Sequence, residues 1–241
     1  MNLPNQTIVI IGGSSGIGFA TAKQAQSEGA RVVIVSRSLA RLKSAQERLG
    51  QAVEIQVADT QDAASLTAAF KAVGPFDHLQ LPGSEISFGF FAELSVIDAQ
   101  AAFLSKFWGP YQAARLALPY LRPQGSITFY SGVYSQLPKN PGAPVVAAIN
   151  SAIEGLARAL AVELAPIRVN TITPGIVDTE LFANLGMNAA ERSAFFEKIV
   201  ANQVIKRPSR PEEIAETALY LMRNTYSTGN TLFVDGGMTL R

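Results

Sequence analysis

The sequence predicts a doubly wound α/β fold, in which a parallel sheet of about seven strands is covered by helices on both faces. Short runs of β-branched and apolar residues recur along the 241-residue chain, and each is followed by a segment with helical periodicity. The runs are apolar throughout rather than alternating, as expected for strands that are buried on both faces. Right-handed crossovers then give the doubly wound order.

The predicted strands are the apolar runs at residues 7–11, 31–36, 53–57, 77–81, 126–131, 167–172 and 230–237. Helical patterns fill the connections, with a long fourth helix around 96–121 and a fifth that begins near Pro144. No repeat, low-complexity stretch or linker interrupts the chain, so we predict a single domain over residues 1–241. Residues 180–202 fall before the last helix, and we expect a mobile helical flap over the substrate there.

Composition narrows the classes of function. The 20 basic and 19 acidic side chains nearly balance without a basic block, so we expect no nucleic-acid partner. The start of the chain lacks a signal-peptide pattern, and charged residues interrupt the apolar helices. Both observations favour a cytoplasmic protein without a membrane span. The absence of cysteine excludes thiolate nucleophiles and Cys-ligated zinc, and we assign no metal site. The single histidine, His78, has no nucleophile-elbow motif beside it, so we expect a structural, strand-edge histidine.

The first predicted strand runs directly into a glycine-rich turn, GGSSGIG, at residues 12–18. Glycines let the backbone turn sharply and approach a pyrophosphate, while the start of the next helix presents backbone N–H groups to it. Because the turn follows the first strand of a βαβ unit, a dinucleotide site is favoured over a purely structural turn. We assign binding to Gly12, Ser14, Ser15, Gly16 and Ile17.

The end of the second strand bears on which dinucleotide binds. An acidic residue there would hold the ribose 2′-hydroxyl of NAD. The chain instead has Ser36 and Arg37, a neutral side chain and a planar cation suited to a phosphate. We therefore expect NADP(H) rather than NAD(H), the alternative being that Arg37 is a solvated surface arginine.

Further motifs follow in a characteristic order over nearly the whole chain. They are VAD at 57–59, AVELAPIRVNTITPGIVDT at 161–179, RPSRPEEIAETALYLM at 207–222 and STGNTLFVDGG at 227–237. With the glycine turn, this set resembles the short-chain dehydrogenase/reductase family. The resemblance implies a Rossmann-like fold and oxidoreductase activity.

The resemblance also implies further cofactor contacts. Asp59, with Thr60 beside it, would contact the adenine, and Gly83 would lie by the adenine ribose. The run Pro174-Gly175-Ile176-Val177, together with Thr179, would hold the nicotinamide amide. The residues agree physically with this assignment, because a Pro-Gly pair at a strand end exposes backbone with which an amide can hydrogen bond.

The proton-transfer residues of the family are altered in this chain. Members usually carry Tyr-x-x-x-Lys on the fifth helix, where the phenol protonates the substrate oxygen and the ammonium lowers the pKa of that phenol. Aligned on AVELAPIRVN, these positions fall on Val146 and Asn150. Valine cannot transfer a proton, although Asn150 could still hydrogen bond a ribose hydroxyl.

Two other family positions also differ. The asparagine expected on the fourth helix falls on Lys106, and the serine expected after the fifth strand falls near Gly132 or Val133, with Ser131 beside it. All four catalytic positions are therefore changed, while the cofactor positions are kept.

Three hypotheses remain open. In the first, the protein is an NADP(H)-dependent oxidoreductase with a relocated proton donor, and it acts on a small apolar carbonyl or quinone-like substrate that needs little acid help. Lys106 is the first candidate donor, and Tyr134 and Ser131 are the next. Lys106 could instead be a surface or interface lysine, and Tyr134 an ordinary packing residue.

In the second hypothesis, the protein binds NADP(H) without turnover, as a sensor or regulatory partner, which the apolar Val145 and Val146 favour. In the third, it is an inactive partner in a mixed oligomer. We favour the enzyme, because a complete set of nicotinamide motifs is best explained if the ring is used.

The fourth and fifth helices bear small and apolar residues on more than one face. One face would cover the sheet, and the other needs a second burial surface. We therefore expect a homodimer or homotetramer through these helices. The substrate pocket is expected to be apolar, with Leu137, Val145, Val146, Phe88, Phe90, Phe91 and the flap residues Leu181, Phe182 and Leu185 around it.

Overall fold

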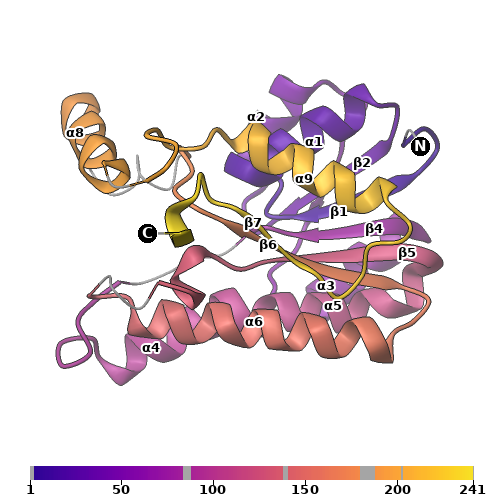
Figure 1. The fold of residues 1–241 in the computed structure, drawn as a ribbon. Helices are drawn as coiled ribbons and strands as arrows, with labels where there is room; N and C mark the ends of the chain where they lie inside the picture. The colour runs from indigo at the N-terminus through magenta and orange to yellow at the C-terminus, as the bar shows by residue number, and fades with distance from the viewer. Residues whose placement is uncertain (1–2, 84–87, 138–140, 180–187, 202, 241) are drawn as a thin grey trace.

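The computed structural model describes residues 3–83, 88–137, 141–179, 188–201 and 203–240 of the chain. Its centre is a seven-stranded parallel sheet with the order β3-β2-β1-β4-β5-β6-β7, which confirms the predicted doubly wound α/β fold (Figure 1). The strands are β1 (Thr7–Ile11), β2 (Arg31–Ser36), β3 (Glu54–Val57), β4 (Phe76–Leu81), β5 (Leu121–Tyr130), β6 (Arg168–Pro174) and β7 (Thr231–Val234).

Helices cover both faces of the sheet. They are α1 (Gly16–Ser27), α2 (Leu39–Leu49), α3 (Ala63–Val73), α4 (Val96–Phe103), α5 (Gly109–Ala117), α6 (Pro144–Glu163), α8 (Ala189–Val200) and α9 (Pro211–Arg223). In Figure 1, α1, α2 and α9 lie above the sheet, and α3, α5 and α6 lie below it. A hydrophobic core lies on each face of the sheet, and alternate residues of β1 point into one or the other. Ile8 and Ile10 pack with α1 and α2, while Val9 and Ile11 pack with α3 and α5.

The fourth predicted helix is not continuous, which corrects the expectation of one helix over 96–121. Between α4 and α5 the chain forms a π-helical segment, η1 (Leu104–Trp108), and a 3-10 turn, η2 (Leu118–Tyr120), follows α5. The N–H of Gly109 donates to the carbonyl of Leu104, five residues back. Pro110 has no N–H to donate, so one backbone hydrogen bond of the helix is missing just where the π-helical segment ends. This segment carries Lys106.

The predicted ranges of β1, β2 and α1 agree with the structure, while other strand ends differ by a few residues. The largest difference is in β5, which begins at Leu121 rather than at 126. His78 lies in β4, an interior strand, and not at a strand edge. Its ring nitrogens contact Ser126 Oγ at 2.8 Å and Gln6 Oε1 at 2.9 Å. Burial lowers the pKa of His78 to about 3, so the ring is neutral and structural.

Helix α6 is the only helix among the described residues that is long and apolar enough to cross a membrane. In the structure it lies along the sheet (Figure 1) and buries Ile149, Ile153 and Ala157 in the core. A core helix of a soluble protein passes the same test of length and composition, so this observation is weak evidence for a membrane span.

Candidate active site

The glycine-rich turn after β1 is packed so closely that side chains would not fit. Gly12 has φ +87°, and a Cβ there would lie 2.4 Å from the Cα of Gly83. A Cβ on Gly18 would lie 2.2 Å from the carbonyl oxygen of Gly12. The turn therefore holds the ends of β1 and β4 together, and it brings Gly12 and Gly83 side by side.

The start of α1 is suited to an anion. Ser15 is the N-cap residue, and its side chain makes no capping hydrogen bond to the helix. No acidic side chain occupies the first turn, which begins with Gly16 and Ile17. Helix N-termini favour negative charge through the backbone N–H groups and the helix dipole. Ser14 is half-buried and Ser15 exposed beside this turn, so both hydroxyls lie at the same helix end.

The ends of β2 and β3 lie next to the glycine turn. The Ser36 hydroxyl accepts a hydrogen bond from the N–H of Ser38 at 3.2 Å, and Arg37 is exposed. Asp59 Oδ1 accepts from the N–H of Gln61 at 2.9 Å, so this carboxylate is held at the end of β3. A Cβ on Gly109 would lie 2.7 Å from Oγ1 of Thr60, so Thr60 packs closely against helix α5.

The loop after β6 contains the residues expected to hold the nicotinamide. Pro174 ends the strand, and the N–H of Gly175 donates to the carbonyl of Val234 at 3.0 Å. A Cβ on Gly175 would lie 2.8 Å from the Cα of Asp235, so only glycine fits against β7 here. Val177 forms a bridge with Ser209, and Thr179 is half-buried at the end of the described loop.

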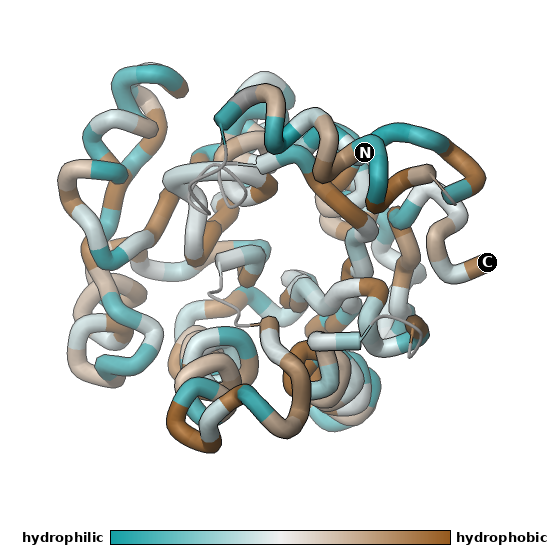
Figure 2. The backbone as a smooth tube through the Cα atoms, turned by 90° about the vertical axis from the view of Figure 1, so that its left-hand side faces the viewer, coloured by the Kyte–Doolittle hydropathy of each residue, from teal (hydrophilic) through white to brown (hydrophobic). Residues whose placement is uncertain are grey.

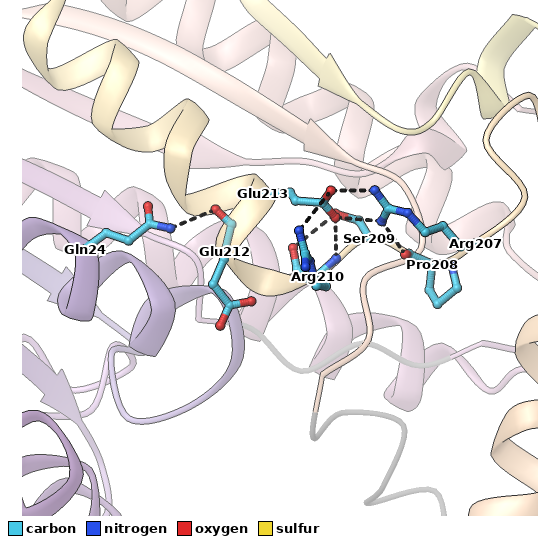
Figure 3. Close-up of polar contacts among 7 residues, drawn as sticks. All are labelled: Gln24, Arg207, Pro208, Ser209, Arg210, Glu212 and Glu213. Carbon is cyan, nitrogen blue, oxygen red and sulfur yellow. Dashed lines mark hydrogen bonds and ion pairs between the residues drawn. The ribbon is translucent and has the colours of Figure 1, made fainter.

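A polar cluster at the start of α9 lies beside this loop (Figure 3). The N–H of Ser209 donates to the carbonyl of Ile176, and the N–H of Asp178 donates to the carbonyl of Ser209, both at 2.8 Å. Glu213 accepts two hydrogen bonds from Arg207, at 2.6 and 2.8 Å, and one from the Ser209 hydroxyl at 3.3 Å. The hydrogen bonds from the Arg207 side chain and then from the N–H of Arg210, at 2.8 Å, lower the pKa of Glu213 to about 2, so the carboxylate stays charged at neutral pH.

The predicted flap is described in part. Its residues 180–187, which include Leu181, Phe182 and Leu185, lie outside the described residues, as does residue 202. Its helix, α8, pairs Arg192 with Asp178 and so connects to the loop after β6.

Lys106 lies inside the molecule rather than on its surface. The side chain comes from η1 and the residue is only 8 % exposed. Its ammonium Nζ donates to the backbone carbonyl of Ser131, just beyond β5, at 3.3 Å. Burial lowers the pKa of Lys106 to about 8, because the charged form is poorly solvated there.

Helix α6 brings Asn150 to the same place. The Asn150 Nδ2 donates to the carbonyl of Gly132 at 3.0 Å, and its backbone carbonyl accepts from the Ser131 hydroxyl at 3.2 Å. The Asn150 Oδ1 is buried and has no hydrogen-bond partner among the described residues. Val146, one turn earlier, is buried and apolar. The structure therefore brings together Lys106, Ser131 and Asn150, while Val146 offers no polar atom.

Tyr134, the remaining candidate donor, lies in a 3-10 turn, η3 (Val133–Ser135). Its ring packs edge-on against Phe88, with centroids 5.6 Å apart. A packing role is therefore established for this ring.

Sequence reasoning missed Glu154, one turn after Asn150 on α6. This carboxylate is 4 % exposed, and its Oε1 accepts hydrogen bonds from three hydroxyls: Ser135 at 2.6 Å, Ser131 at 2.7 Å and Thr173 at 3.5 Å. The available signal was its spacing. A charged residue four positions after Asn150, within an apolar helix, lies on the same face as Asn150.

Comparisons with known proteins identify the family of the chain. A family model described as Enoyl-(Acyl carrier protein) reductase matches residues 12–239. Short-chain dehydrogenase/reductase ATR9 of Stachybotrys chlorohalonatus is 32% identical over 253 residues, covering 98% of each chain. The chain belongs to the short-chain dehydrogenase/reductase family.

Solved structures are similar to this chain over nearly its whole length. A crystal structure of a small-chain dehydrogenase in complex with NADPH is 36% identical, with a TM-score of 0.83 over 98% of this chain and 100% of that one. The MalC Reductase/Diels-Alderase of Malbranchea aurantiaca is 28% identical, with a TM-score of 0.89 over 99% and 98% of the two chains. Both of these solved structures share the whole of this fold.

Among the described residues of this family member, no group of three or more His, Asp or Glu side chains could hold a metal ion.

The residues expected to line one apolar pocket do not all lie together in the structure. Phe91 and Val145 line an open groove of about 600 Å³. Val146 and Leu137 are buried and Phe88 and Phe90 are exposed, and none of these four lines the groove. The other groove residues lie before, on and after α4: Leu94, Val96, Ala99, Gln100, Phe103, Leu104 and Trp108.

Proposed function

We propose that the protein is an NADP(H)-dependent oxidoreductase that transfers hydride to or from a small apolar carbonyl or quinone-like substrate, with Lys106 as the proton donor. The observation that carries this proposal is the buried ammonium of Lys106 beside the residues that follow β5. The relative crystallised with NADPH supports the choice of cofactor, as does Arg37 at the end of β2.

The residues present fit a dinucleotide. The uncapped start of α1 suits the pyrophosphate, and the tight approach of Gly12 to Gly83 keeps side chains out of the turn. The unpartnered Oδ1 of Asn150 suits a ribose hydroxyl, since a buried acceptor without a partner is costly. Arg37 and Ser36 would hold the 2′-phosphate, Asp59 and Thr60 the adenine, and residues 174–179 the nicotinamide amide. When bound, NADPH supplies the hydride.

In the reduction direction, the ammonium of Lys106 gives one proton to the substrate oxygen while the carbonyl carbon receives hydride. Lys106 becomes a neutral amine and then regains a proton from solvent. A pKa of about 8 suits this role, because a general acid works best when its pKa lies near the working pH. A positioned acid contributes on the order of 10²–10⁴ in rate.

The first test measures NADPH consumption with 9,10-phenanthrenequinone, menadione and diacetyl. We expect turnover that falls at least tenfold in Lys106→Met, while Lys43→Met, an exposed lysine on α2, behaves as wild type. Turnover that is unchanged in Lys106→Met would exclude this donor.

The second test is calorimetric titration with NADP⁺ and NAD⁺. We expect Arg37→Ala to weaken NADP⁺ binding more than NAD⁺ binding, because only NADP⁺ carries the 2′-phosphate. The exposed Lys71 provides the matched control Lys71→Ala. Equal affinity of the wild type for both nucleotides would contradict the assignment of Arg37.

A second candidate function is binding of NADP(H) without turnover, as a sensor or regulatory partner. It is favoured by the apolar, buried Val146 and by the lack of a side chain at Gly132. NADP⁺ binding without NADPH consumption across a broad carbonyl and quinone panel would support it over the enzyme.

We also propose that the open groove beside α4 is covered by a second copy of the chain in a homodimer or homotetramer. Val96, Ile97 and Trp108 are each more than half exposed on this face. Figure 2 turns this end of the molecule toward the viewer, and hydrophobic stretches in brown lie along its lower segments. Light scattering should give an oligomer at micromolar concentration that Trp108→Glu dissociates and Leu39→Glu, on α2, does not. A monomeric wild type would refute this assembly.

A further inference from the structure

Glu154 is a buried acid in an apolar helix. At 4 % exposed, it lies among Val146, Ile149, Ile153 and Ala157 as one of the buried residues of α6. Burying a carboxylate is expensive unless hydrogen bonds and opposite charge compensate for the lost water. The described residues place no Lys or Arg in a direct ion pair with it, so its charge must be balanced at longer range.

The hydrogen bonds of Glu154 converge on one oxygen. Its Oε1 accepts from Ser135 and Ser131 at 2.6 and 2.7 Å, both of which belong to the turn after β5. The longer contact from Thr173, at 3.5 Å, comes from β6. A single carboxylate oxygen therefore ties α6 to the ends of two neighbouring strands, at the edge of the sheet where parallel strands present ligand sites.

Ser131 connects this carboxylate to the buried lysine. Its hydroxyl donates to Glu154, and its backbone carbonyl accepts from Nζ of Lys106 at 3.3 Å. Ser131 is itself 5 % exposed, and its N–H is fixed by the carbonyl of Ile172 at 2.9 Å. One ordered residue thus separates a buried carboxylate from a buried ammonium.

We propose that Glu154 is a positioning residue that fixes the ammonium of Lys106 through Ser131 and provides the negative charge that balances it. The inference rests on the proposed function in giving Lys106 the role of proton donor. Glu154 does not contact substrate in this scheme. It holds the Ser131 carbonyl in place, and its charge favours the protonated, proton-donating form of Lys106.

The charged and titratable groups around η1 single out Glu154. Among the described residues, α4 carries Asp98, α5 carries Tyr111 and Arg115, α6 carries Glu154, Arg158 and Glu163, and the turn after β5 carries Tyr134. All of these except Glu154 are exposed or half-buried, so water screens their charges. Glu154 is the buried group among them that can act on Lys106 through a medium of low dielectric constant.

The test follows the titration of Lys106 by NMR in protein labelled with [ε-¹³C]lysine, with the signal assigned by its loss in Lys106→Met. We expect Glu154→Gln, which keeps an acceptor oxygen but removes the charge, to move the Lys106 midpoint to lower pH. Ser131→Ala should move it in the same direction, since it removes the hydroxyl link. Glu163→Gln, an exposed acid on the same helix, is the matched control and should leave it unchanged.

A double-mutant cycle gives a second measurement. If Glu154 acts through Lys106, the effects of Glu154→Gln and Lys106→Met on the free energy of unfolding should not add. An unchanged Lys106 midpoint together with additive effects would overturn the proposal and leave Glu154 as a structural link between α6 and the sheet. Neither measurement needs cofactor or substrate. A shifted midpoint in a protein without turnover would therefore contradict the proposed enzyme and not the positioning role.

Discussion

Lys106→Met is predicted to stabilise the fold while it lowers activity. Lys106 is buried, and this burial lowers its pKa from 10.5 to about 8. Below pH 8 the folded protein therefore holds an ammonium in a site that disfavours its charge. Methionine has a similar length and no charge, so it fills the same space without that penalty.

The magnitude follows from the difference between the two pKa values. At about 1.4 kcal/mol for each pH unit, the charged lysine destabilises the fold by about 3 kcal/mol at pH 7. Its hydrogen bond to the Ser131 carbonyl is long, at 3.3 Å, and stabilises the folded state by about 1 kcal/mol. We therefore expect the free energy of unfolding to rise by about 2 kcal/mol in Lys106→Met.

Urea unfolding at several pH values provides the assay. Between pH 8 and 10.5 the unfolded state binds more protons at this site than the folded state, so the stability of the wild type rises with pH in that window. The advantage of Lys106→Met should accordingly shrink from pH 8 upward and reach zero before pH 10.5, where the remaining charge penalty equals the lost hydrogen bond. The exposed Lys43 gives the control Lys43→Met, for which no stabilisation is expected. A Lys106→Met variant less stable than wild type at pH 7 would show that the site solvates the ammonium well, and the reasoning would fail.

Three further predictions concern other measurements. NADPH-dependent reduction should lose rate as the pH rises through about 8, because Lys106 loses its proton there, and a pH–rate profile flat to pH 9.5 would argue for another donor. Arg168→Met should destabilise the protein by about 3 kcal/mol in urea unfolding, since the buried guanidinium donates to the carbonyls of Leu221, Met222 and Ser227 at 2.6 to 3.3 Å. Tyr130→Phe should cost about 1–2 kcal/mol in the same assay without changing NADP⁺ affinity, because it leaves the buried oxygen of Gln80 without its donor at 3.0 Å.

The sequence by itself determined the sheet and the cofactor turn. The apolar runs of β1 and β2, the helix α1 and the glycines between them are local patterns, because strand burial and positive φ both restrict the residue types at a given position. The order of motifs also identified the family before any geometry was known. Neither result depended on which distant residues come into contact.

The tertiary structure alone decided what surrounds the catalytic candidates. Whether Lys106 faces solvent or the interior depends on the π-helical segment that interrupts the fourth helix, and on the Ser131 carbonyl contributed 25 positions later in the chain. The spacing of Glu154 puts it on the same face of α6 as Asn150, but only the folded chain shows that hydroxyls of Ser131, Ser135 and Thr173 converge on it. The pKa and charge state of a side chain are set by burial and by neighbours from other elements, and those neighbours meet only when the chain is folded.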